Sequence, residues 1–113
     1  MTAKQFDNRS DIDILIADEN IDIIVYRVAD EIYSEDDPLN VTKVMSNVVK
    51  ALKEKLTVVL DFAEVDYPER DRVLTAARGA AHFLEGSAIK VSEDIYIIVG
   101  NPDVGIIQWP RGR

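Results

Sequence analysis

The chain has 113 residues, with 13 basic and 21 acidic side chains, a formal net charge of -8 and no cysteine. This length suits one domain, and the negative charge disfavours nucleic acid as a partner, because phosphate contacts need a basic face. The absence of cysteine excludes disulfides and thiolate metal sites, and no apolar run reaches the roughly 18 residues that a membrane span needs. We therefore expect a soluble, cytoplasmic protein.

The first third of the chain predicts a loose start followed by two strands. Residues 1–11 are polar and predict a flexible N-terminal segment, with neither the pattern of a signal peptide nor that of an amphipathic anchor. Residues 12–17 and 21–28 are short apolar runs on either side of an acidic break, which is typical of strands. Residues 29–40 are acidic and rich in turn formers, so they predict a solvated connection.

A helix is expected from residue 40. Its apolar residues recur at intervals of three and four: Val41, Val44, Met45, Val48, Val49 and Leu52. Residues 56–60, which follow, are apolar on both faces and predict a central strand parallel to 21–28, with the helix as the crossover between them.

A second helix is expected after Asp66. Asp66 is a candidate cap, Pro68 falls in the first turn, Glu69 follows three residues after the cap, and Gly86 is the expected end. One predicted buried stripe contains Val73, Ala77, Ala80 and Leu84. A second stripe contains Ala76, Gly79 and Phe83. Glycine costs a helix about 1 kcal/mol relative to alanine, so Gly79 marks a close approach, either of a second subunit or of the chain's own sheet.

The last part of the chain predicts a β-hairpin, with strands at 88–91 and 95–99 around the turn residues Ser92, Glu93 and Asp94. Residues 104–109 are a candidate edge strand, and 110–113 are expected to be a disordered tail.

Together these elements predict one α/β (α+β) sandwich domain over residues 12–109. Its mixed sheet has about five strands, with two helices on one face, in β-α-β-α-β-β order. The opposite face is expected to meet a second copy of the chain and form a homodimer, because four apolar residues cannot all point at water: Ile24, Tyr26, Val59 and Ile98.

No residue pattern in the chain predicts catalysis. His82 is the only histidine, and no serine or cysteine is placed to use it as a base. Asp61, Glu64 and Asp66 follow a strand end and could hold magnesium, but three acids among 21 are weak evidence for a metal site. The glycines form no phosphate-binding loop. We expect no enzyme, no metal and no cofactor.

Lys90 and Tyr96 form the most informative pair. Both are three residues from Glu93, so a hairpin centred there places them opposite one another on the same face. Two interpretations remain open: an ordinary cross-strand pair in which the lysine stem covers the ring, or a shallow site with one cation and one aromatic platform for a peptide that carries apolar side chains and a carboxylate.

Residues 72–98 resemble the core of the SepF family, cytoplasmic cell-division proteins that link FtsZ filaments to the membrane. The resemblance is carried by Gly79 in a helix, then Gly86 and a small residue before Ile89 and Lys90, and after a short turn Ile95 and Tyr96. It extends over residues 21–107, and Thr57, Val58, Val59, Leu60, Asp61 and Phe62 match the family's central strand.

The resemblance implies a non-enzymatic α/β sandwich at the division site that forms homodimers, can assemble further and binds the C-terminal tail of FtsZ. It implies tail binding at Lys90 and Tyr96, where phenylalanine is usual, and contact between subunits at Gly79, in the stripe shared with Ala76 and Phe83. The family's amphipathic membrane helix has no counterpart here, so membrane contact is expected only indirectly or through a segment outside this sequence.

Two further departures suggest a divergent or archaeal-type member. Thr75 and Ala76 replace the family's Asp-Phe pair, and neither the acidic insertion 30–37 nor the run 12–17 has a clear counterpart. The alternative is a regulatory domain that resembles the anti-sigma-factor antagonists, because residues 58–62 precede a helix as they do there. Those domains carry a phosphorylatable Ser or Thr at the helix start, where this chain has Tyr67, Pro68 and Glu69.

Overall fold

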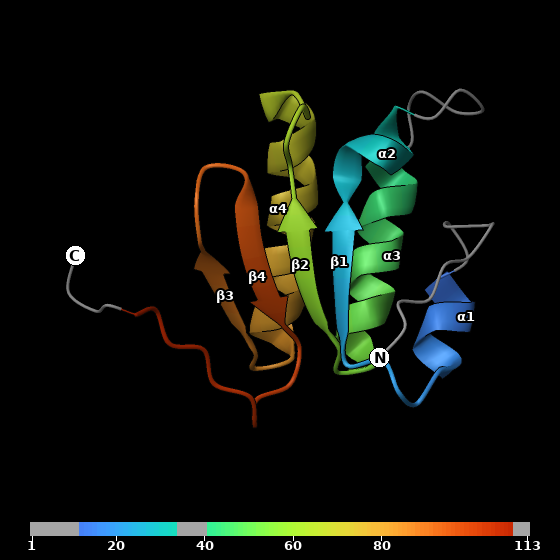
Figure 1. Ribbon diagram of the computed structural model, residues 1–113, viewed down its shortest axis with the longest axis vertical. Helices are drawn as coiled ribbons and strands as arrows, with labels where there is room; N and C mark the ends of the chain where they lie inside the picture. Colours follow the sequence, from blue (N-terminus) through green and yellow to red (C-terminus); the bar gives the residue numbers. More distant parts are fainter. Residues whose placement is uncertain (1–11, 34–40, 110–113) are drawn as a thin grey trace.

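The computed structural model describes residues 12–33 and 41–109 of the chain. Its elements run in the order α1 (Ile12–Ala17), β1 (Ile23–Arg27), α2 (Val28–Ile32), α3 (Val41–Lys53), β2 (Thr57–Asp61), α4 (Tyr67–Phe83), β3 (Ser87–Lys90) and β4 (Ile95–Val99) (Figure 1). The expected flexible segment 1–11 and disordered tail 110–113 lie outside the described residues, as does much of the expected connection 29–40.

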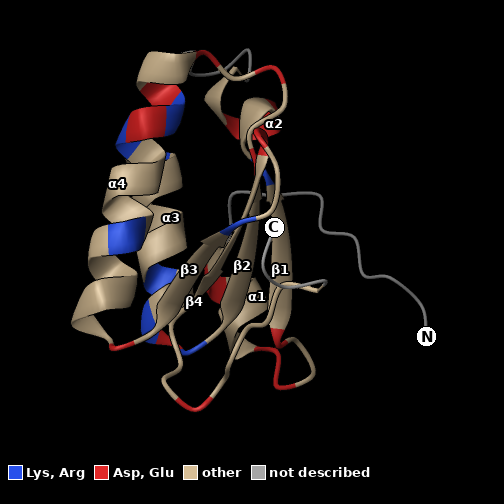
Figure 2. Cartoon of the chain, turned by 90° about the vertical axis from the view of Figure 1, so that its left-hand side faces the viewer, with Lys and Arg blue, Asp and Glu red and all other residues tan. Residues whose placement is uncertain are grey.

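The four strands form one mixed sheet in the order β1-β2-β4-β3. β1 is parallel to β2, as the sequence predicted, and the β2–β4 and β3–β4 pairs are antiparallel. α3 and α4 lie side by side on one face of this sheet, and Figure 2 shows that no helix formed by residues 12–33 or 41–109 covers the other face. The two long helices on one face are therefore as predicted.

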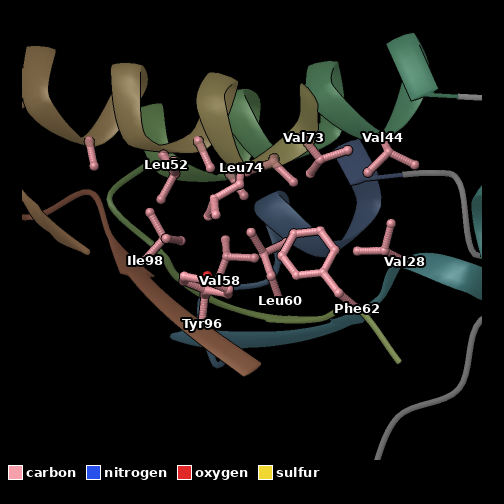
Figure 3. Packing of buried hydrophobic residues seen from close by; sticks show 14 of the residues in the cluster. Val28, Val44, Leu52, Val58, Leu60, Phe62, Val73, Leu74, Tyr96 and Ile98 are labelled. Carbon is pink, nitrogen blue, oxygen red and sulfur yellow. The ribbon is translucent and has the colours of Figure 1, made fainter. Parts of the chain in front are cut away.

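The core lies between the sheet and the two long helices (Figure 3). Alternate residues of the strands point into it, among them Val58, Leu60 and Ile98, and all three are fully buried. Phe62, at the end of β2, is the largest fully buried side chain. Burial of side chains of this size stabilises the fold by about 1.5–3 kcal/mol each relative to exposure.

The first predicted strand is wrong: residues 12–17 form helix α1. Ile12 is buried, and Leu15 and Ile16 pack against the core from the same side of the helix. Their spacing of three and four residues is that of a helix face, and α1 packs against α3 rather than joining the sheet. A short apolar run fits both the strand period and the helix period, so tertiary packing decides which of the two elements forms.

The second predicted strand, residues 21–28, forms as β1 but ends early, because Val28 begins helix α2. The expected solvated connection therefore contains buried Ile32 and Glu31. A polar network makes this burial possible: Tyr26 Oη donates to Glu31 Oε1 at 2.7 Å, and Asn47 Nδ2 donates to Tyr26 Oη at 3.0 Å. Burial raises the pKa of Tyr26 far above its ordinary value, so the phenol stays protonated as a donor.

The predicted fifth strand does not form. Residues 104–109 run as an irregular segment, in which Gln108 Nε2 donates to the carbonyl oxygen of Lys90 at 3.3 Å. With α1 and α2 added, the described part of the chain has four strands and four helices, rather than about five strands and two helices. The observed order is consequently α-β-α-α-β-α-β-β.

Helix α4 begins where predicted, but it ends before Gly86. Asp66 occupies the cap position, yet its side chain makes no capping hydrogen bond. At the other end, the helix stops at Phe83, and Glu85 takes the left-handed conformation with φ 60°. Gly86 serves close packing instead: a Cβ there would lie 1.8 Å from the carbonyl oxygen of Val99, so only glycine lets β3 start against β4.

The strand register also corrects the composition of the open face of the sheet. Ile24, Tyr26 and Ile98 point toward the helices and contact the core, so only Val59 of the four expected residues lies on the open face. Successive residues of a strand alternate between faces, so the residues next to Ile24, Tyr26 and Ile98 lie on the open face. A row across all four strands results: Val25, Val59, Ile97 and Ile89 are consecutive register partners. We call this row the open apolar face.

Candidate functional site

Lys90 and Tyr96 are register partners on the β3–β4 ribbon, so the predicted pairing is confirmed. The Lys90 ammonium is exposed and lies 2.9 Å from the carboxylate Oε2 of Glu93, in the turn of the same hairpin. This contact raises the pKa of Lys90 and lowers the pKa of Glu93, since each ion favours the charged form of the other. The ribbon therefore carries one accessible cation whose present partner is a local carboxylate.

Tyr96 is not the accessible aromatic platform that we expected, because its side chain is only 8% exposed. It points to the helix side of β4, like Ile98, and its ring packs edge-on against Phe62 with the centroids 5.8 Å apart. The guanidinium of Arg78 lies over the ring, 5.6 Å from its centroid. Since β3 lies at the sheet edge, the same side of the ribbon leaves Lys90 in solvent while it buries Tyr96.

Arg70, near the start of α4, connects the hairpin turn to the rest of the domain. Its Nη1 donates to the carbonyl oxygen of Glu93 at 3.0 Å and to Asp94 Oδ1 at 3.1 Å. Its Nη2 donates to the carbonyl oxygens of Phe62 and Val65, each at 3.0 Å. A side chain that is only 8% exposed thus holds the β3–β4 turn against the β2–α4 loop.

The sequence contained a signal for Arg70 that our interpretation missed. Arg70 stands three residues before Val73 and seven before Ala77, so it continues the buried stripe of the helix. A charged residue at a buried position needs several partners, and a guanidinium can satisfy several carbonyl groups at once. The sequence could have marked Arg70 as a buried anchor, although not which carbonyls it would reach.

Among the described residues, Tyr67 is the more exposed of two exposed aromatic residues at this end of the molecule, the other being Tyr33, which is 44% exposed and hydrogen-bonded to the Asp66 amide. The Tyr67 side chain is 60% exposed, and the Arg70 guanidinium lies 4.5 Å from its ring centroid. The sequence indicated only that Tyr67 stands at the start of a helix, and no periodic pattern distinguishes it as a site residue.

The outer face of α4 carries the three residues assigned to self-association. Gly79 and Phe83 are exposed, Phe83 to 83%, and Ala76 is half-buried. Within the described part of the chain, no atom outside the helix's local backbone lies within 4 Å of a Cβ built at Gly79. Close packing of Gly79 on the chain's own sheet is therefore wrong, and contact with a second subunit stays a prediction.

Of the acidic residues at and after the end of β2, Asp61 bonds the backbone through its side chain. Asp61 Oδ1 accepts a hydrogen bond from the amide of Ala63 at 3.0 Å, and the backbone amide of Asp66 donates to Tyr33 Oη at 3.1 Å. Across residues 12–33 and 41–109, no three His, Asp or Glu side chains are grouped as metal ligands would be. His82 is exposed on the last turn of α4.

The fold and this site define a two-layer α+β domain with a charged hairpin at one edge and an uncovered apolar sheet face. The chain belongs to the SepF family: the family model described as cell division protein SepF matches residues 38–102. This membership connects the chain with cell division. No curated protein matches the chain. Among the helices described, none is both long and apolar enough to cross a membrane.

Proposed function

We propose that this chain is a non-enzymatic adaptor of cell division, acting in the cytoplasm at the division site, which forms homodimers and binds the C-terminal tail of FtsZ. The observation that carries the proposal is Lys90, an exposed cation at the ribbon position that the family resemblance assigns to tail binding. Tyr96 lies beside this position on the neighbouring strand, with its side chain buried. Family membership favours this function over a regulatory domain of the anti-sigma-factor antagonist type.

The electrostatics of Lys90 suit a peptide with a carboxylate. The chain as a whole carries a formal charge of -8, which repels acidic partners at long range. Close to the ribbon, however, the Lys90 ammonium and the guanidinium of Arg78 over Tyr96 are local cations. A peptide carboxylate would take the place of the Glu93 carboxylate at Lys90, so binding exchanges one exposed ion pair for another.

The open apolar face supports the homodimer. Val25 is 65% exposed and Ile23 is 60% exposed, and the row of Val25, Val59, Ile97 and Ile89 crosses the whole sheet. A continuous apolar surface of this kind is unusual on a monomer and suits a self-complementary interface around a twofold axis. We assign the primary dimer contact to this face and further assembly to Ala76, Gly79 and Phe83 on α4.

A peptide titration tests the tail-binding site. A fluorescently labelled FtsZ tail peptide from the same organism should bind the wild-type chain in the micromolar range by anisotropy, and Lys90→Glu should abolish binding. The matched control is Lys53→Glu, which makes the same charge change on α3, at the end of the molecule away from the hairpin turn (Figure 1). Equal loss in both variants would show a response to net charge only, and unchanged binding in Lys90→Glu would reject the site.

A further inference from the structure

We infer that Tyr67, in the first turn of α4, supplies the exposed aromatic contact of the peptide site beside Lys90. This inference rests on the proposed function and deepens it, because it assigns the apolar half of peptide recognition to a residue outside the β3–β4 ribbon. The expected arrangement is an apolar side chain of the peptide on the Tyr67 ring and a peptide carboxylate at the Lys90 ammonium.

Accessibility favours Tyr67 over Tyr96. The Tyr67 side chain is 60% exposed, whereas Tyr96 is 8% exposed and is covered by Arg78 and Phe62. A bound peptide could reach the Tyr96 ring only after Arg78 moves. The Tyr67 ring needs no such rearrangement.

The Tyr67 ring is also held in place. The Arg70 guanidinium stacks 4.5 Å from its centroid, and that guanidinium is fixed by hydrogen bonds to Phe62, Val65, Glu93 and Asp94. An aromatic side chain that is ordered before binding loses less conformational entropy when a partner packs against it. Aromatic residues of this kind are frequent among the residues that dominate peptide and protein interfaces.

Tyr67 and Lys90 are brought to the same end of the hairpin through Glu93. Arg70, which stacks on Tyr67, donates to the backbone carbonyl of Glu93 at 3.0 Å, and the Glu93 carboxylate lies 2.9 Å from the Lys90 ammonium. Figure 1 shows the start of α4 and the β3–β4 turn at the same end of the domain. The Lys90 ammonium therefore contacts Glu93 directly, and the Tyr67 ring is connected to the same residue through Arg70.

The test is a titration of the labelled FtsZ tail peptide against three variants of the full chain. Tyr67→Ala should weaken binding about tenfold, and Tyr67→Phe should stay within about twofold of wild type, because the ring and not the hydroxyl makes the contact. His82→Ala is the matched control: it removes an exposed ring from the last turn of the same helix and should leave the affinity unchanged. Circular dichroism and thermal melting of each variant should match wild type.

The possible outcomes separate the inference from the function on which it rests. If Tyr67→Ala binds like wild type while Lys90→Glu does not bind, the role of Tyr67 is overturned and the tail-binding function stands. If Tyr67→Ala and His82→Ala weaken binding equally, the specific contact is likewise overturned. If the wild-type chain does not bind the peptide at all, the proposed function fails and the inference fails with it.

Discussion

Lys90 lies directly opposite Tyr96 on the β3–β4 ribbon, with its ammonium in solvent while the phenol ring is buried against Phe62 and beneath Arg78. The difference arises at the sheet edge, where β4 has a neighbouring strand on both sides and β3 has one on one side only. Lys90 is therefore an accessible cation, whereas Tyr96 fixes the ribbon to the core.

Arg70 should be a large contributor to stability. Arg70→Met keeps much of the side-chain length but removes the donors to Phe62, Val65, Glu93 and Asp94, and it leaves buried carbonyl oxygens without a partner. We expect the free energy of unfolding to fall by about 3 kcal/mol in urea denaturation. Arg72→Met, two residues along and exposed, is the control and should cost little. An equal loss in the two variants would contradict the anchoring role.

Glu93 should compete with the peptide for Lys90. Glu93→Gln removes the carboxylate that lies 2.9 Å from the ammonium, while the backbone carbonyl that Arg70 uses remains. The affinity for the FtsZ tail peptide should rise by a factor of about two to five, and by less at high salt, because both groups are exposed and screened. Glu85→Gln, an exposed acid after α4, gives the same change in net charge and is the control. A lower affinity in Glu93→Gln would mean that the carboxylate orders Lys90 instead of competing for it.

Two glycines should respond oppositely to alanine. Gly86→Ala places a Cβ against the carbonyl oxygen of Val99 and should destabilise the domain by about 1–3 kcal/mol. Gly79→Ala meets no described atom and lies within a helix, so it should stabilise the subunit by about 1 kcal/mol. Urea denaturation of both variants at matched concentrations measures the difference. An unchanged free energy of unfolding in Gly86→Ala would contradict close packing at Gly86.

The open apolar face should control dimerisation. Val25→Lys adds a charge to the most exposed residue of the row Val25, Val59, Ile97 and Ile89, and should give monomers by multi-angle light scattering. Gly79→Lys places the same charge on the outer face of α4 and should leave this dimer intact. The reverse result, with Gly79→Lys monomeric and Val25→Lys dimeric, would assign the primary contact to the helix.

The sequence predicted secondary structure best where apolar residues kept one spacing throughout an element. The helix around Val44 and Val48, the parallel strand at Val58 and the hairpin register of Lys90 with Tyr96 all follow from repeated spacing or from symmetry about a turn. The run 12–17 is too short to separate a helix from a strand, and packing against α3 decided it. The sequence predicted a solvated connection from residue 29, because the burial of Glu31 depends on Tyr26 and on Asn47, which lies 16 residues further along the chain.

The site was predictable in position but not in exposure. Symmetry about Glu93 placed Lys90 opposite Tyr96, but burial depends on where α4 lies relative to each strand, and strand periodicity does not contain that information. Arg70 reaches the carbonyls of Phe62 and Glu93 across two loops, a contact that only the fold brings about. Tyr67 is a candidate because its ring is exposed and Arg70 connects it to the hairpin turn, and both features depend on the fold.

The most direct test of the tail-binding site is a heteronuclear NMR titration of the nitrogen-15-labelled chain with unlabelled FtsZ tail peptide. The backbone amides that shift should cluster at the start of α4, around Tyr67 and Arg70, and along the hairpin from Ile89 to Tyr96, with α3 unaffected. Shifts confined to α3 or to the outer face of α4 around Gly79, or no shifts at saturating peptide, would contradict a peptide site built on Lys90.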